Sequence, residues 1–282
     1  MSKHHDTYRG KGLRPGLAAA SEKTKIIGNF GPVCAWLFCI SLLCFPGAGY
    51  SQSDAISTIS FSNFELLTSA GSVQYEAVWG SQAFAQGQNS LGQIDQEFAS
   101  TTGGTSSIGA TVTYATASAL ANGVSLSGAA SSNVSILGAT AQAISTGIGT
   151  LSNTFEITGG TGSVMVTFSV QIVGSESVAT SQLSALAQTQ TLFAVQVNGL
   201  PVLTFDPTLS VGPGSSASNS FDETLSITMP LNFDTLYSLT VVADQESEVI
   251  STTPEPSTAC FAFIGLAVLG AYIRRKRTQT SS

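Results

Sequence analysis

The chain has 282 residues, 43% hydrophobic and only 10% charged, with a formal net charge of −7. Every Lys and Arg lies up to Lys25 or from Arg274 onward, so residues 52–252 carry 14 Asp and Glu but no Lys, Arg, His or Cys. This composition excludes disulfides, His- or Cys-based catalysis and His/Cys zinc or copper sites from that stretch. It also argues against binding to nucleic acid, because no side chain there neutralises phosphate.

The N-terminal segment has the order of a secretory signal peptide. Basic residues are scattered over positions 3–25, residues 33–45 form an uncharged apolar run, and small residues follow at 47–51. A basic region, an apolar region and small residues in this order are typical of a leader that is removed during export. We therefore predict that residues 1–51 are a signal peptide with a long basic n-region.

Residues 52–252, the β domain, have the length and pattern of one all-β unit. The clearest strand covers 163–173, where apolar residues recur at every second position. Further strands are predicted at 56–66, 73–79, 191–197, 200–205, 224–229 and 236–243. We expect a mainly β fold, an antiparallel β-sandwich (jelly-roll-like) ectodomain, with helices only in the two membrane segments.

A long stretch of small residues lies inside this domain, at positions 99–153. Short alternations persist in it, as in 111–114 and 124–126. We expect weak strands faced with Ala and Ser, because small side chains let sheets pack closely but leave the strand register poorly specified.

The sharpest local signal is Asn198-Gly199 between two apolar alternating runs. This dipeptide is preferred in type I′ hairpin turns, which need positive φ at both positions. In that hairpin Val197 faces Leu200, and Val195 faces Val202. Pro201 lacks a backbone donor, so its strand is expected at a sheet edge.

Carboxylates are the remaining chemical groups of the β domain. Glycoside hydrolysis needs two carboxyl groups at a set separation, and calcium needs only oxygen ligands. The nearest candidates in sequence are Asp95 with Glu97, Asp222 with Glu223, and the set Asp244, Glu246 and Glu248. The last set shares one face of a strand and is the first candidate for a calcium site.

The simplest interpretation is that these acids form a solvated surface of the domain and bind no specific ligand. No EF-hand loop is present, and Trp79 is the single Trp of the β domain, which is little for a cleft that stacks on sugars. We therefore expect a domain without cofactor and without enzymatic activity.

The C-terminal tail combines three features. A Pro-Glu-Pro triplet is followed by an uncharged apolar run over 258–273 and then by four basic residues. The prolines favour an extended stalk, and the run predicts one transmembrane helix of about 24 Å whose basic end stays in the cytoplasm. The residues concerned are Pro254, Glu255, Pro256, Arg274, Arg275, Lys276 and Arg277.

This tail, residues 253–282, resembles the PEP-CTERM protein-sorting signal of Gram-negative bacteria, although Thr253 stands where that family often has Val. The resemblance implies processing by an exosortase, a membrane-embedded sorting enzyme. It also implies a destination at the cell surface or extracellular matrix, associated with exopolysaccharide or biofilm.

We expect an exported, non-enzymatic surface or matrix protein. The alternatives are a calcium-dependent carbohydrate-binding or adhesion module and a carboxylate-pair glycoside hydrolase.

Overall fold

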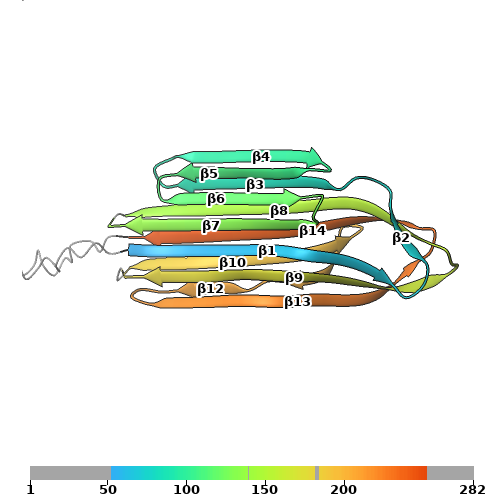
Figure 1. Ribbon diagram of the computed structural model, residues 1–282. Coiled ribbons are helices and arrows are strands. Elements are labelled where there is room, and N and C mark those ends of the chain that lie inside the picture. Colours follow the sequence, from blue (N-terminus) through green and yellow to red (C-terminus); the bar gives the residue numbers. More distant parts are fainter. Residues whose placement is uncertain (1–51, 139, 182–183, 253–282) are drawn as a thin grey trace, which may run out of the picture. The chain divides into compact units, whose positions relative to one another are not determined.

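Residues 52–138, 140–181 and 184–252 are described by a computed structural model, and they form antiparallel β-structure (Figure 1). The predicted signal peptide, the predicted spanning helix and the residues of the sorting tail lie outside these ranges. Within them, no helix is long and apolar enough to cross a membrane. The mainly antiparallel β prediction is confirmed for the described ranges.

Two sheets contain the strands. Sheet I has the order β13 (Ser216–Asn232), β9 (Ser163–Thr180), β1 (Gln52–Thr68), β7 (Ser127–Leu137), β6 (Ala115–Asn122) and β5 (Thr105–Val112). Sheet II has the order β11 (Leu200–Phe205), β10 (Ala185–Val197), β14 (Leu236–Ser251), β8 (Ala141–Thr158), β3 (Gly80–Asn89) and β4 (Ile94–Thr102); β12 (Thr208–Val211) also pairs with β10, and β2 (Ser72–Tyr75) with β8.

Alternation along the long strands separates an inner face from an outer one. In β8 and β14, almost every second side chain is buried between the sheets. Two large apolar clusters result, besides a small one formed by Ala85, Ala110 and Ala117. One is rich in aromatic residues and includes Phe61, Phe155, Phe168 and Phe193. The other is built from small and β-branched residues such as Ala55, Val134, Val178 and Val249.

The sheets approach very closely where β8 faces β6 and β7. A Cβ atom at Gly147 would lie 2.5 Å from the carbonyl oxygen of Ser118 and 2.7 Å from that of Ser131. A Cβ atom at Gly149 would lie 2.6 Å from the carbonyl oxygen of Leu120. The stretch 99–153 therefore forms regular strands, as predicted, and its small residues let two backbones come together.

The Asn198-Gly199 turn joins β10 to β11 as predicted. Asn198 and Gly199 have φ of 52° and 75°, and Val197 pairs with Leu200. β11 lies at the edge of sheet II, which suits Pro201. The pairing of Val195 with Val202 is wrong: the register shifts between Val195 and Gln196, and Val195 pairs with Leu203. A β-bulge causes this shift because it places one extra residue on one strand of the pair.

Replacement of Gly199 by Val is expected to lower the free energy of unfolding by roughly 1–2 kcal/mol, because a β-branched residue is strained at positive φ. No atom lies within 4 Å of the added Cβ, so crowding does not contribute. Urea unfolding of the Gly199→Val and Gly212→Val variants measures the effect, since Gly212 also has open space around it but no positive φ. Equal stability of the two variants would contradict the turn assignment.

Several strands differ in length from the predictions. The predicted strand 73–79 ends at Tyr75, and the chain then bends so that Trp79 packs edge-on against Phe64. The predicted strand 236–243 continues to Ser251, and 224–229 is the middle of β13. Neighbouring strands extend these elements, because a ladder continues wherever a partner supplies backbone hydrogen bonds.

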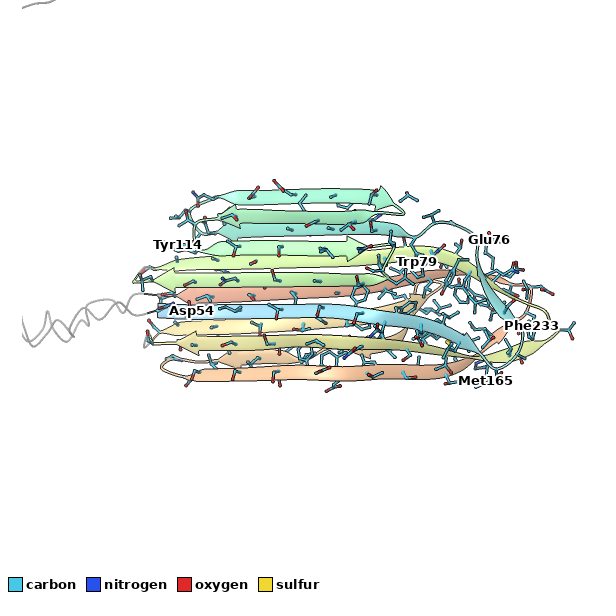
Figure 2. The ribbon with its side chains drawn as sticks, viewed as in Figure 1. Asp54, Glu76, Trp79, Tyr114, Met165 and Phe233 are labelled. Carbon is cyan, nitrogen blue, oxygen red and sulfur yellow. The ribbon has the colours of Figure 1, made fainter. Side chains whose placement is uncertain are left out.

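Both ends of the β domain lie at the same end of the sheets, beside the connection from β9 to β10 (Figure 1). The Ser181 amide donates to the Gln52 carbonyl at 2.9 Å. The Thr252 hydroxyl donates to the Ser184 carbonyl at 2.9 Å. Asp54 lies towards this end in Figure 2, whereas Trp79, Met165 and Phe233 lie towards the opposite end. The predicted leader and the sorting tail therefore join the β domain at neighbouring points.

Candidate functional site

The acids Asp244, Glu246 and Glu248 lie on the outer face of β14, since the residues between them point into the core. On this face their cross-strand neighbours are Leu192, Gln190 and Gln188 of β10. On the other side, β8 places Ile148, Thr146 and Ile144 opposite them. The three carboxylates therefore have different cross-strand neighbours.

Glu248 is held by two amide groups. The Gln142 side chain donates to its Oε1 at 2.8 Å, and the Gln188 side chain donates to its Oε2 at 2.6 Å. Beside it is a pocket of about 280 Å³, lined by Gln188, Thr189, Gln190, Thr208, Leu209, Ser210, Glu246 and Glu248. This pocket offers side-chain oxygens and amides at the surface.

Asp244 lies between two apolar cross-strand neighbours, Leu192 and Ile148. Its Oδ1 is buried without a hydrogen-bond partner. Burial, and secondarily the charge of Glu246, raises the pKa of Asp244 to about 6.

These acids do not converge. Among the residues described by the structure, no group of three or more His, Cys, Asp or Glu side chains is placed to hold a metal ion. Along a strand the carboxylates stand two residues apart and point outward in parallel, so they do not enclose a cation. The structure thus gives no support to a calcium site at Asp244, Glu246 and Glu248.

The other carboxylate pairs are engaged or separated. Asp95 accepts a hydrogen bond from the Thr111 backbone amide at 2.7 Å, which satisfies a donor of β5. Asp222 and Glu223 are consecutive in β13, so their side chains point to opposite faces. Asp222 also accepts from the Gln171 side chain at 3.1 Å. Asp222 and Glu223 therefore do not act on one substrate from one face.

Replacement of Asp244 by Asn should stabilise the protein at pH 7 by roughly 1–3 kcal/mol, less any part screened by solvent. The folded-state pKa lies above the ordinary value of 3.8, so the folded state holds the proton more tightly than the unfolded chain. Stability from this group is therefore greatest below about pH 4 and declines as the pH rises to about 6.

Urea unfolding of the wild type and the Asp244→Asn variant at several pH values from about 4 to about 7 measures the effect. Glu223→Gln, which removes an exposed charge from β13, is the control for net charge. An Asn variant that is no more stable than the wild type at pH 7 would contradict the conclusion that burial of the Asp244 carboxylate destabilises the folded state.

A second polar group lies inside the sandwich and was not among the predicted site residues. Glu176 of β9 is 1% exposed, and the Thr191 hydroxyl contacts its Oε1 at 2.8 Å. The sequence already indicated this position. The apolar alternation of 163–173, continued for two more repeats of two residues, places position 176 on the inner face.

The geometry defines a class: an all-β domain whose described part contains no group of three or more His, Cys, Asp or Glu side chains that could hold a metal ion. It is joined directly to a C-terminal tail, which the family comparison identifies. Residues 252–277 match the family model of the PEP-CTERM protein-sorting motif. The chain is therefore a PEP-CTERM sorting domain-containing protein, of the exported kind that exosortase sorts towards the cell surface. No curated protein and no solved structure matches the chain.

Proposed function

We propose that this protein is a non-enzymatic component of the cell surface or extracellular matrix, sorted by its tail and associated there with exopolysaccharide. The match of residues 252–277 to the sorting motif carries the proposal. A single membrane helix at 258–273 holds the protein until exosortase acts on the tail.

The placement of the chain ends supports this role. Gln52 is hydrogen-bonded to Ser181, and Thr252 is hydrogen-bonded to Ser184; both serines lie in the connection from β9 to β10. β14 has 16 residues, and at about 3.3 Å per residue it spans roughly 50 Å. A protein tethered through its tail therefore presents the turns at the opposite end of the strands, including the Asn198-Gly199 hairpin, away from the membrane.

A structural role also agrees with the state of the acids. The carboxylate of Glu248 is occupied by two Gln amides, and that of Asp95 by a backbone amide. Stability without basic side chains relies on apolar burial and backbone hydrogen bonds, which the two long-stranded sheets supply. The polar pocket beside Glu248 offers hydrogen-bonding groups suited to the hydroxyls of a polysaccharide.

Cell fractionation tests the sorting step. In a host with exosortase, the wild type should reach the surface or medium, whereas a Pro254→Ala/Pro256→Ala variant should stay in the membrane fraction. Pro213→Ala is the matched control, because Pro213 lies in an exposed turn of the β domain. A double variant that reaches the surface as well as the control does would refute the proposal.

Association with polysaccharide is tested separately on surface material. The protein should sediment with the exopolysaccharide and be released when the polysaccharide is digested enzymatically. A protein that remains soluble in the presence of intact polysaccharide would contradict this part of the proposal.

A further inference from the structure

A belt of polar side chains crosses the interior between the two apolar clusters. Sheet I contributes Glu176, Ser57 and Ser132, which lie side by side in the register of β9, β1 and β7. Sheet II contributes Thr191 and Gln245 in one row and Thr189 and Ser247 in the next. All seven side chains are at most 3% exposed. The belt therefore has to satisfy its polar groups internally.

The serine part of the belt forms its own network. The Ser57 hydroxyl lies 3.2 Å from that of Ser132 and 3.3 Å from that of Ser247. These contacts bridge the two sheets with neutral groups. The other bridge, from Glu176 to Thr191 and Gln245, contains the ionisable member of the belt.

The hydrogen-bond count at Thr191 constrains the state of Glu176. The Thr191 hydroxyl contacts Oε1 of Glu176 at 2.8 Å and Oε1 of Gln245 at 3.0 Å. A hydroxyl carries one hydrogen and donates only once. With the Gln245 amide oriented as in the structure, so that its Oε1 faces Thr191, both contacts are hydrogen bonds if the carboxylic acid of Glu176 donates to Thr191 and Thr191 then donates to Gln245.

The charge balance favours the same state. Oε2 of Glu176, Nε2 of Gln245 and Oγ1 of Thr189 are buried without a partner. An ionised carboxylate would leave a charged oxygen unpaired in the interior, which is far more costly than an unpaired neutral carbonyl oxygen. Residues 52–252 contain no basic side chain that could compensate it.

The groups around Glu176 add no compensation. Thr189, Thr191, Gln245 and Ser57 are neutral. The charged group that acts on Glu176 is Asp206, from the connection between β11 and β12. Burial is the largest influence and raises the pKa of Glu176. The nearby hydroxyls of Thr191 and Thr189 oppose this shift, and the charge of Asp206 adds the smallest, raising contribution.

We propose that Glu176 is protonated in the folded protein and, through Thr191 and Gln245, forms a pH-sensitive clasp between the two sheets. The clasp is closed while the carboxyl group keeps its proton. When the proton is lost to solvent at higher pH, Glu176 ceases to donate and a buried negative charge appears between the sheets. The folded state is then weakened on the side of β9 and β10.

Thermal unfolding of the full-length protein in neutral detergent tests the clasp, at constant ionic strength between about pH 5 and about pH 9. The melting temperature of the wild type should decline with pH. In the Glu176→Gln variant this decline should be smaller by about 3 °C or more, because Gln donates at every pH. Glu223→Gln removes the same charge from the surface and should keep the wild-type profile.

Three results would overturn the proposal. One is a Glu176→Gln profile parallel to that of the wild type. Another is a wild-type decline that added sodium chloride abolishes or that the Glu223→Gln control does not share, since repulsion between surface charges would then explain it. The third is the absence, at pH 7, of the infrared carbonyl band of a protonated carboxyl group from the Asp244→Asn variant, in which Asp244 cannot supply that band. This last measurement decides the question even if the Glu176→Gln variant does not fold.

Discussion

Replacement of Gly147 by Val is expected to unfold the protein or to lower its free energy of unfolding by about 3 kcal/mol or more. The added Cβ would meet two backbone carbonyl oxygens, of Ser118 and Ser131, at 2.5 and 2.7 Å. Neither oxygen belongs to a flexible side chain, so relief requires the sheets to separate. Far-ultraviolet circular dichroism and urea unfolding measure the loss.

Gly212→Val is the matched control for this substitution, because the same side chain there meets no atom within 4 Å. It should cost less than about 1 kcal/mol. If Gly147→Val were as stable as Gly212→Val, the close approach of β8 to β6 and β7 would be wrong.

Replacement of Phe155 by Ala should lower the free energy of unfolding by about 3–5 kcal/mol. Phe155 is fully buried in β8, where its ring stacks on Tyr237 with centroids 5.4 Å apart. The Phe168 ring from sheet I meets it edge-on at 6.3 Å. The substitution therefore removes a contact between the sheets and leaves a cavity.

Phe98→Ala provides the comparison, because Phe98 is 60% exposed on the edge strand β4. Its loss should change stability by about 0.5 kcal/mol at most. Similar losses for the two variants in urea unfolding would contradict the assignment of the aromatic cluster to the core.

Local patterns in the sequence predicted those strands and turns whose geometry depends on residues close together in the chain. The alternation of 163–173 and the Asn198-Gly199 turn depend on neighbouring residues, and both are found where expected. The bulge between Val195 and Gln196 was missed because a register shift depends on the pairing of two strands. The long strand β8 was only weakly indicated by the sequence. Its Gly147 and Gly149 are needed because the backbone of the other sheet lies so close, and this contact cannot be seen in the local sequence.

The candidate site was less predictable than the fold. Alternation placed Asp244, Glu246 and Glu248 on one face, but it did not reveal that Gln142 and Gln188, distant in sequence, bind Glu248. Apolar cross-strand neighbours set the environment of Asp244, and these are known only once β10 and β8 are paired with β14. In contrast, the sorting tail is a contiguous motif and needs no tertiary structure to be recognised.

Mass spectrometry of the protein isolated from the surface of a host with exosortase tests the central claim most directly. If the protein is exported and its tail is processed, peptides from residues 52–252 should be abundant. Peptides from the leader before about residue 51 and peptides containing Arg274–Arg277 should both be missing. Surface protein that retains Arg274–Arg277 would contradict processing of the tail, and surface protein with an intact leader would contradict export through a cleaved signal peptide.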